Sequence, residues 1–483
     1  MKKKTLISLL LTLTLVTASC GNTSVGNETT TNDPVTTEPE ETTEAEILLD
    51  IPSGLRFNGK TIRVLQSDEK LISGNNEGEV VSEAVYYRSL AVEEQLGIKF
   101  EYTQIPYREI ATTLSNSVNA SSDDFDLVFN PASYNVSLVN SGYYTPVSEL
   151  PYIDLDKPWW NKDYIESVSL KAERAAILFG DICYNSIERI VGVLFNKDLL
   201  AEVKDMNDTD MYQLVIDGKW TLDKYGEISK GVYRDVNGNG EHDKEDIYAT
   251  TPRAYYAIDW LAYSAGLRFT ERDKDGYPAL NMNNERTVDL VDKLLALFVN
   301  NDDVLEYSLA ENKEHTQKFA DGGALFLINR LYCCGWDELR MMKDDFGILP
   351  TPKLDETIDG YHSVVGDLVV WGGVPVTATN LDAISAAAEL LAYEGRQRVT
   401  PVYYETALKI KYARDDMSSQ MIDIITSGAR TDFLFMNHLG NLGTIFQDIY
   451  KNGENTFASL YASYENAALS NLESLKAELE KNS

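Results

Sequence analysis

The sequence predicts an α/β protein with a largely parallel sheet, and three observations support this fold class. Short β-type runs alternate with stretches of helical spacing from residue 58 onward. A hydrophobic content of 43% with 25% charged residues is typical of a soluble globular protein. The chain has 483 residues, enough for two or three compact units at ~100–200 residues each. We therefore expect more than one α/β unit.

Residues 1–19 show the pattern of an export signal. Three lysines at positions 2–4 precede an apolar run over residues 6–16, and small residues lead into Cys20. The run is shorter than the ~20 apolar residues of a transmembrane helix. A cysteine at this place resembles the bacterial lipobox, although Thr17 stands where that motif usually has leucine. It implies cleavage before Cys20 and lipidation of Cys20. The alternative is an ordinary secretory signal with an unrelated cysteine.

Residues 20–50 are predicted to be a lipidated, disordered tether. Most of this segment consists of Thr, Asn, Glu, Gly, Pro and Ser, which offer too little apolar surface to form a core. The formal net charge of the whole chain is −33, and loss of the signal lysines makes it more negative. Such a chain repels nucleic acid and anionic lipid, so we expect membrane contact through the lipid alone. We also expect a monomer, and the acidic surface serves solubility.

The remaining cysteines indicate buried thiols. They are Cys183, Cys333 and Cys334, and no metal-type spacing is present. Adjacent cysteines seldom pair because a disulfide needs a wider separation. A bridge from Cys183 to one of the pair remains an alternative.

The N-terminal part of the folded chain alternates strands and helices. Strands are predicted at 61–65, 98–102 and 126–129, and helices at 82–96 and 107–119, the first helix ending at Gly97. Ligands of such sheets bind beyond the carboxyl ends of the strands, which directs attention to the loop after Phe129. Further helices are predicted at 381–393, from Pro401 within 400–413, and at 467–481 with leucines at 469, 472, 475 and 479 on one side.

Several short passages occur in an informative order. They are DFDLVF at 124–129, GYYTPV at 142–147, IVGVLFNKDLL at 190–200, WTLDKYGEI at 220–228, FADGGALFLI at 319–328 and FGILPTPK at 346–353. This order resembles the maltose-binding type of periplasmic and extracellular solute-binding protein, and the passage at 190–200 is the closest match. The resemblance covers roughly residues 58 to 430. It bears on the fold and on a role in import, and says little about the solute.

The resemblance implies a two-lobe periplasmic-binding-protein-like fold of type II, with discontinuous lobes joined by hinge strands. Lobe 1 would comprise residues 51–187 plus 365–405, and lobe 2 residues 188–364 plus 406–483. The hinge candidates are the passages near 189–193 and 363–370. The solute would lie between the lobes and be enclosed by hinge closure.

The resemblance also implies which residues contact the solute. Sugar sites need aromatic platforms and fixed hydrogen-bonding groups, and the chain is rich in aromatic residues. The passages that match contact regions of the family contain Asn130, Ser133, Tyr134, Asp259, Trp260, Tyr332, Trp336 and Trp371. For each aromatic residue the alternative is core packing. Arg189 is a further candidate, which would either neutralise Glu188 or hold an anionic solute.

Residues 235–246, DVNGNGEHDKED, carry the spacing of an EF-hand calcium loop. Side-chain oxygens recur at Asp235, Asn237 and Asn239, Gly240 allows the sharp turn, Glu241 offers its carbonyl, and Asp243 and Asp246 occupy positions nine and twelve. Position twelve is normally glutamate, and the shorter aspartate coordinates less fully. We therefore expect a structural Ca²⁺ with an affinity in the extracellular range. The alternative is a turn rich in Asn and Asp.

These features predict a lipid-anchored solute-binding protein on the extracytoplasmic face of the cell membrane. It would deliver a solute, with a sugar or oligosaccharide as the first candidate, to the permease subunits of an ABC importer. Peptides and other polar solutes remain open, as does a role in feeding a membrane sensor. We expect no enzyme, because the chain lacks the HExxH, GxSxG and phosphate-loop motifs. A secreted glycoside hydrolase with paired carboxylates is the remaining alternative.

Overall fold

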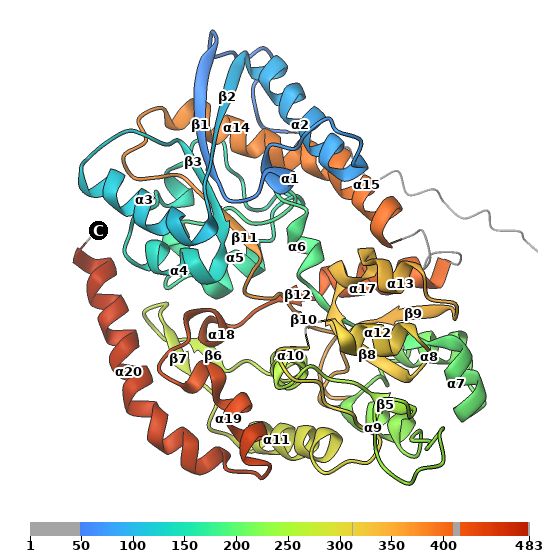
Figure 1. The fold of residues 1–483 in the computed structure, drawn as a ribbon. Coiled ribbons are helices and arrows are strands. Elements are labelled where there is room, and N and C mark those ends of the chain that lie inside the picture. Colours follow the sequence, from blue (N-terminus) through green and yellow to red (C-terminus); the bar gives the residue numbers. More distant parts are fainter. Residues whose placement is uncertain (1–48, 312, 409–415, 482–483) are drawn as a thin grey trace, which may run out of the picture. The chain divides into compact units, whose positions relative to one another are not determined.

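The computed structural model describes residues 49–311, 313–408 and 416–481 (Figure 1). The predicted signal, Cys20 and all of the predicted tether up to residue 48 lie outside the described residues. Two four-stranded sheets organise the described chain. One large hydrophobic core extends from the first sheet to one face of the second, and another packs against the opposite face of the second sheet.

The first sheet has the strand order β11-β3-β1-β2. Its members are β1 (Lys60–Gln66), β2 (Ile98–Gln104), β3 (Leu127–Pro131) and β11 (Val370–Gly373). The three strands predicted from the sequence pair in parallel, β1 with both β2 and β3. The fourth strand, β11, was not predicted, and it joins the edge at β3 in antiparallel orientation.

Helices cover both faces of this sheet because successive side chains of a strand point to opposite faces. Ile62 and Val64 of β1 share a core with α2 (Val80–Leu96) and α14 (Leu381–Glu394), which lie side by side in Figure 1. Leu65 belongs to a second cluster with α3 (Tyr107–Asn119) and α4 (Ala132–Asn140). The helix α2 ends at Gly97, as predicted, because that residue adopts φ 60°, which glycine tolerates best.

The chain passes from the first sheet to the second and later returns. It leaves through α6 (Asn185–Glu188) into β4 (Val191–Asn196), and returns through β10 (Ser363–Val364) into β11. Ile190 forms an antiparallel bridge with Val365, so the two passages predicted as hinge candidates lie side by side. β10 also pairs in parallel with β12 (Ala429–Arg430).

The second sheet has the order β5-β8-β4-β9 and is mixed. Its outer members are β5 (Tyr248–Thr250) and β9 (Phe346–Leu349), with β8 (Ala324–Arg330) beside β4. β5 and β8 are parallel, whereas β4 runs antiparallel to both of its neighbours. All six residues of β4 are buried, which explains its nearly continuous apolar sequence.

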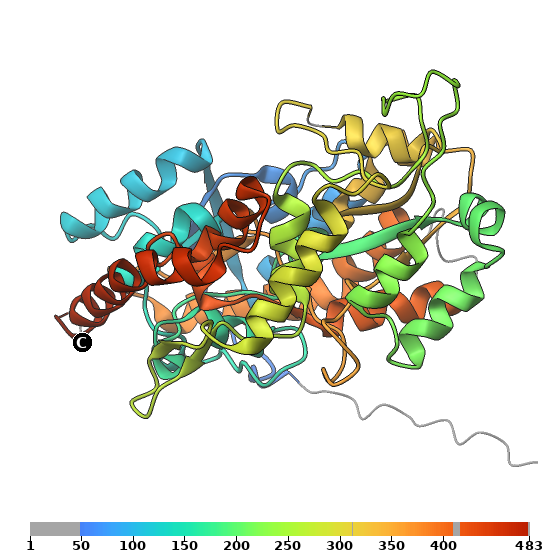
Figure 2. The same cartoon turned by 90° about the horizontal axis from the view of Figure 1, so that it is seen from below.

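Short helices surround the second sheet and continue to the C-terminus. α10 (Tyr256–Ser264) and α11 (Glu285–Phe298) lie side by side in both views (Figures 1 and 2). Further helices of the described chain are α5 (Lys162–Val168), α7 (Lys197–Lys204), α8 (Asp208–Ile216), α9 (Leu222–Ser229), α12 (Glu314–Ala320), α13 (Asp337–Arg340), α17 (Asp416–Ser427), α18 (Phe433–Asn437) and α19 (Ile445–Asn452). A hairpin of β6 (Thr270–Arg272) and β7 (Pro278–Leu280) completes this region.

The first part of the helix predicted within 400–413 is α15 (Thr400–Tyr403), which continues as a π-helical turn over Tyr404–Leu408. Residues 409–413 lie outside the described residues. The closing helix α20 (Phe457–Lys481) begins well before residue 467, where the sequence placed its start. Its buried side runs through Phe457, Tyr461, Ala468 and Leu472. Leu469, predicted on the apolar side, is 43% exposed. The other three leucines confirm the predicted side, because Leu472 is buried and Leu475 and Leu479 pack half-buried against the same core.

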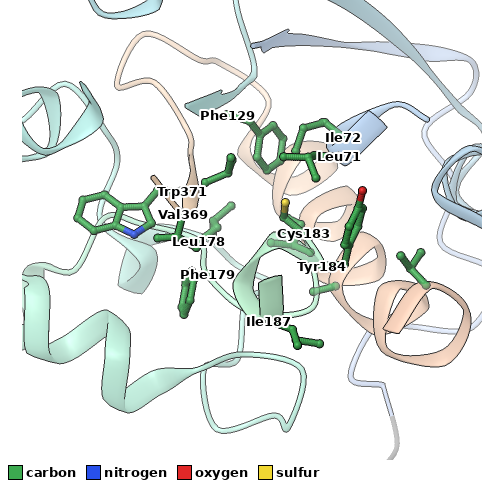
Figure 3. Close-up of a cluster of buried hydrophobic side chains, with 14 of the residues drawn as sticks. Leu71, Ile72, Phe129, Leu178, Phe179, Cys183, Tyr184, Ile187, Val369 and Trp371 are labelled. Carbon is green, nitrogen blue, oxygen red and sulfur yellow. The ribbon is translucent and has the colours of Figure 1, made fainter. Parts of the chain in front are cut away.

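A buried tryptophan pair and buried cysteines belong to the first hydrophobic core. The indole N–H groups of Trp159 and Trp160 donate to the two carboxylate oxygens of Glu389 at 2.9 and 2.7 Å. These two bonds satisfy the buried carboxylate and tie residues 159–160 to α14. All three described cysteines are buried and none of them forms a disulfide, and Cys183 lies in the apolar cluster of Figure 3. Within the described residues, no helix is long and apolar enough to cross a membrane.

Candidate functional site

The returning passage after β10 packs against three other segments and defines the candidate site. The backbone oxygen of Asp367 accepts a hydrogen bond from Ser133 N at 3.0 Å, and Gly366 N donates to Arg189 O at 2.9 Å. A Cβ atom at position 366 would lie 3.2 Å from Cδ of Arg330. The glycine therefore permits a close approach between the returning chain and the end of β8.

The loop after β3 contributes the first group of predicted residues. Asn130 lies at the carboxyl end of β3, opposite Trp371 of β11, and both polar atoms of its buried side chain lack a hydrogen-bond partner. The hydroxyl of Ser133, at the start of α4, is also buried without a partner. Tyr134 follows on α4, with its ring edge-on to Tyr107 at a centroid distance of 4.8 Å.

Trp371 occupies a different environment from its strand neighbour. It is 1% exposed, and its indole N–H donates to the hydroxyl of Tyr164 at 3.2 Å. Figure 3 shows it among Val369, Leu178 and Phe179 of the first core. Trp371 thus packs in the first core next to the strand that carries Asn130, and its ligand role remains a prediction.

Two arginines meet over one tyrosine ring. Arg189 ends α6 and Arg330 ends β8, and the pairing of Val191 with Arg330 brings the two segments together. The guanidinium carbons of Arg189 and Arg330 lie 4.8 and 5.3 Å from the centroid of the Tyr332 ring. The ring of Trp336 stands edge-on to Tyr332 at 4.9 Å. Cation–π contacts of this kind hold a positive charge in a fixed position.

The start of α10 supplies an aromatic platform. The rings of Tyr256 and Trp260 stack at a centroid distance of 5.4 Å, one helical turn apart. Arg330 also lies 5.3 Å from the Trp260 ring, so the platform is continuous with Tyr332. We refer to Arg189, Tyr256, Trp260, Arg330 and Tyr332 as the arginine–aromatic cluster.

Asp259 is a buried acid beside this cluster. Its Oδ2 accepts a hydrogen bond from Gln447 at 2.6 Å, while Oδ1 has no partner. Burial raises the pKa of Asp259 to about 8, the Gln447 bond and the charge of Lys451 oppose this rise, and the charge of Asp367 adds to it. At neutral pH the carboxyl is therefore mostly protonated and has a hydrogen to donate.

Buried polar atoms without a hydrogen-bond partner concentrate at this place. They belong to Asn130, Ser133, Arg189, Arg253, Asp259, His315 and Arg330. An unpartnered buried polar atom is costly in a folded protein, so a concentration of them indicates groups that await a ligand or water. The structure thus brings most of the predicted contact residues together around Asp367.

Sequence reasoning missed several members of the site. Arg330, Asp367, Arg253 and Gln447 were not named as contacts, although Arg330 lies two residues after the passage at 319–328. Tyr256 could have been found from its spacing of four residues to Trp260 on a helix. Gln447 carried no such signal, because only the packing of α19 against α10 brings it to Asp259.

A hollow of about 1030 Å³ lies elsewhere in the described chain. It is lined by parts of α5 and β6, the loop at 353–362 and residues 428–433, and none of the predicted solute contacts lines it. A second hollow of about 530 Å³ lies near Trp159 and Trp160. Volume alone does not identify a binding site, and the convergence of unpartnered polar atoms and aromatic faces favours the arginine–aromatic cluster.

The predicted calcium loop is a closed turn with most of its side-chain oxygens directed inward. Arg234 and Ile247 close its base through two backbone hydrogen bonds of 3.0 and 3.1 Å. Asp235 accepts from the backbone N–H of Gly238 at 2.6 Å and of Gly240 at 2.8 Å. Oδ1 of Asn237 and of Asn239 accept from the N–H two residues later, at 2.9 and 2.7 Å.

The second half of the loop brings two further carboxylates. Asp246 is fully buried and accepts from the N–H of Val236 at 3.1 Å and from the hydroxyl of Tyr233 at 3.1 Å. Asp243 accepts from the side-chain amides of Asn237 and Asn239. The backbone N–H of Glu245 and then these amides lower the pKa of Asp243, so it stays ionised.

The donor set of the loop consists of hard oxygens, which Ca²⁺ prefers. Counting only His, Cys, Asp and Glu side chains, the described part of the chain has no group of three that could hold a metal ion. Coordination here would therefore depend on amide and carbonyl oxygens as well, as the EF-hand pattern requires. The residues fit Ca²⁺ on this chemistry.

The fold agrees with the comparisons to known proteins. A family model described as bacterial extracellular solute-binding protein matches residues 91–395, more than half of the chain. The chain belongs to this family. No curated protein sequence matches this solute-binding protein. The family consists of solute-binding proteins and not of enzymes, as the sequence predicted, and membership places the protein outside the cytoplasm.

Solved structures confirm the predicted type II fold of this solute-binding protein. UspC from M. tuberculosis matches with a TM-score of 0.56 at 15% identity, over 85% of this chain and 99% of the other. An ABC substrate-binding protein from Listeria monocytogenes in complex with cycloalternan matches with 0.51 at 13% identity, over 87% and 99%. A cyclo/maltodextrin-binding protein complexed with maltotetraose matches with 0.54 at 11% identity, over 87% and 98%.

The raised pKa of Asp259 predicts a pH-dependent stability. The unfolded side chain ionises near pH ~3.9, whereas the folded one keeps its proton to about pH 8. The folded state therefore binds more protons between these values, and the free energy of unfolding falls as the pH rises through this window. In Asp259→Asn this contribution is absent, so the variant gains stability relative to wild type as pH rises. Urea unfolding at several pH values measures this.

The matched control is Asp275→Asn, a carboxylate with a 61% exposed side chain on the β6–β7 turn. Its curve should run parallel to that of the wild type. If the Asp259→Asn curve also ran parallel, a buried protonated Asp259 would be excluded.

Proposed function

We propose that this protein is anchored by a lipid on the outer side of the cell membrane, captures a carbohydrate, and delivers it to an ABC importer. The observation that carries the proposal is the arginine–aromatic cluster with its unpartnered buried polar atoms. Such a combination of aromatic faces and fixed hydrogen-bonding groups suits a solute with weakly apolar faces and a polar rim.

Two kinds of observation support a carbohydrate as the solute. The stacked pair of Tyr256 and Trp260 offers a flat surface, and Asn130, Ser133 and Asp259 offer both donors and acceptors nearby. Two of the similar structures hold cycloalternan and maltotetraose. Their low identity to this chain limits that support to the shared fold, so the chemistry of the cluster carries the argument.

The two-sheet arrangement supports a capture mechanism that depends on hinge closure. We propose lobes as the sequence divides them, 51–187 plus 365–405 and 188–364 plus 406–483. Asn130 and Ser133 belong to the first and Arg330 and Asp259 to the second. Closing the lobes on a solute would let both sets of polar groups bond to it at once, which favours the closed state.

The N-terminal pattern supports the anchor, and the loop at 235–246 supports a structural Ca²⁺. Lipidation of Cys20 followed by a polar tether would keep the binding unit near the membrane and its permease. The loop would hold Ca²⁺ through Asp235, Asn237, Asn239, the carbonyl of Glu241, Asp243 and Asp246. The ion would fix the segment between α9 and β5.

Removing the aromatic platform should weaken binding of oligosaccharides. Trp260→Ala deletes the ring between Tyr256 and Arg330, and we expect a loss of about 2 kcal/mol, roughly thirtyfold in Kd. Isothermal titration against neutral and acidic oligosaccharides measures this. The control Tyr87→Ala removes a half-exposed ring of α2 and should leave Kd unchanged. If no carbohydrate bound to the wild type, the proposed function would fail.

Calcium should stabilise the protein through the loop. At about a hundredfold excess over its Kd, an ion that binds only the folded state adds ~2.7 kcal/mol to the free energy of unfolding. We expect a chelator to lower the Tm of the wild type, and Asp235→Asn to abolish the difference between calcium and chelator. The exposed Asp275→Asn should respond like the wild type. Identical melting curves with calcium and with chelator would exclude the ion.

Replacement of the predicted lipidation site should release the protein. In Cys20→Ser no lipid is attached, so we expect the chain to move from the membrane fraction to the medium or the soluble fraction. Cell fractionation followed by immunoblotting measures this. Cys183→Ser, which alters a buried thiol of the folded part, is the control and should remain with the membrane. Equal distribution of wild type and Cys20→Ser would contradict the anchor.

A further inference from the structure

Three arginines surround the platform of the candidate site. Arg189 and Arg330 lie over Tyr332 at 4.8 and 5.3 Å, and Arg253 lies 5.6 Å from the centroid of the Tyr256 ring. All three are only partly exposed. Because they come from the end of α6, the end of β8 and the loop before α10, their proximity is a product of the tertiary fold.

None of the three arginines forms an ion pair with a carboxylate among the described residues. The Nε atom of each is buried without an acceptor, and Arg253 donates only to the backbone oxygen of Leu309, at 2.6 Å. Five other described arginines pair with carboxylates, as Arg286 does with Asp355, whereas others, such as the buried Arg88, bond only to backbone oxygens. In a chain of net charge −33, three unpaired guanidinium groups in one place are unexpected.

The acids nearby do not neutralise this charge. Burial raises the pKa of Asp259 to about 8 and that of Glu188 to about 7, so both carry less than a full negative charge at neutral pH. Burial, and then the charges of Arg253 and Arg330, lower the pKa of His315 to about 4 and keep it neutral. Asp367 acts on Arg330 electrostatically without forming an ion pair. The cluster therefore keeps an excess of positive charge.

We propose that the solute is a carbohydrate that carries a negative group, carboxylate or sulfate, which Arg189, Arg253 and Arg330 receive. The inference rests on the proposed function and specifies its substrate class. A neutral sugar that covered these guanidinium groups would remove them from water without compensating their charge, which is unfavourable. An anionic group offsets that loss, and the planar guanidinium matches the oxygens of carboxylate and sulfate. The aromatic faces beneath the arginines hold them ready for this contact.

The decisive experiment compares solutes that differ in charge alone. The intact protein is titrated calorimetrically with oligomers of galacturonic, glucuronic and mannuronic acid, with their methyl esters, and with neutral glucose and galactose oligomers of the same length. Sulfated and unsulfated disaccharides form a second pair. We expect at least one acidic member to bind on the order of tenfold to a hundredfold more tightly than its neutral counterpart, and this preference to shrink as salt rises.

Substitutions assign the effect to the cluster. Arg330→Gln should remove about tenfold or more of the affinity for the acidic solute while changing that for a neutral oligosaccharide less than about threefold. Arg330→Lys keeps the charge and should recover part of the loss. Arg286→Gln removes an arginine of α11 that pairs with Asp355 and should bind like the wild type. Melting curves of all variants identify any loss of folding.

The outcomes separate this inference from the proposed function. If neutral oligosaccharides bind and no acidic member of the panel binds more tightly, the charge inference is overturned while the carbohydrate function stands. The same holds if Arg330→Gln weakens acidic and neutral solutes equally. If no carbohydrate binds at all, the proposed function itself is overturned. A preference for sulfated over carboxylated members would identify which anionic group the site receives.

Discussion

The return of the chain between β10 and β11 is the constraint on which the rest of the structure depends. It adds β11 to the edge of the first sheet, next to β3, and it bridges to Ile190 where the chain first left that sheet. The same passage brings Gly366 and Asp367 against Ser133, Arg189 and Arg330. One stretch of backbone therefore completes a sheet and assembles a site from segments far apart in the sequence.

The site contains buried polar groups that have lost their hydrogen bonds to water and regain only some of them within the protein. Trp371 and Tyr164 bond to each other in the core next to the strand that carries Asn130. Asn130, Ser133 and the arginines keep buried polar atoms without partners. Such groups lower the stability of the empty protein and become favourable when a ligand bonds to them. Binding affinity and the stability of the free protein are thus opposed at the same residues.

The local environment sets the charge at two places. Burial raises the pKa of Asp259 to about 8 and that of Glu188 to about 7, which leaves the nearby guanidinium charges only partly opposed. In the loop at 235–246 the opposite arrangement holds, since backbone N–H groups keep Asp243 ionised. A solute and a cation would therefore meet fields of opposite sign in one protein.

The sequence by itself determined the family, the α/β class, the three parallel strands of the first sheet and the segments that contain Asn130, Asp259 and Tyr332. These follow from local periodicity, turn residues and the order of short passages, which act over a few residues at a time. It missed β11, the start of α20, Arg330, Asp367 and Gln447. Those depend on contacts between distant segments, such as α19 with α10 and β11 with β3, which local patterns do not encode. Only the tertiary structure decided that the arginines share a site, because their lack of ion pairs depends on where the fold places the carboxylates of the described residues.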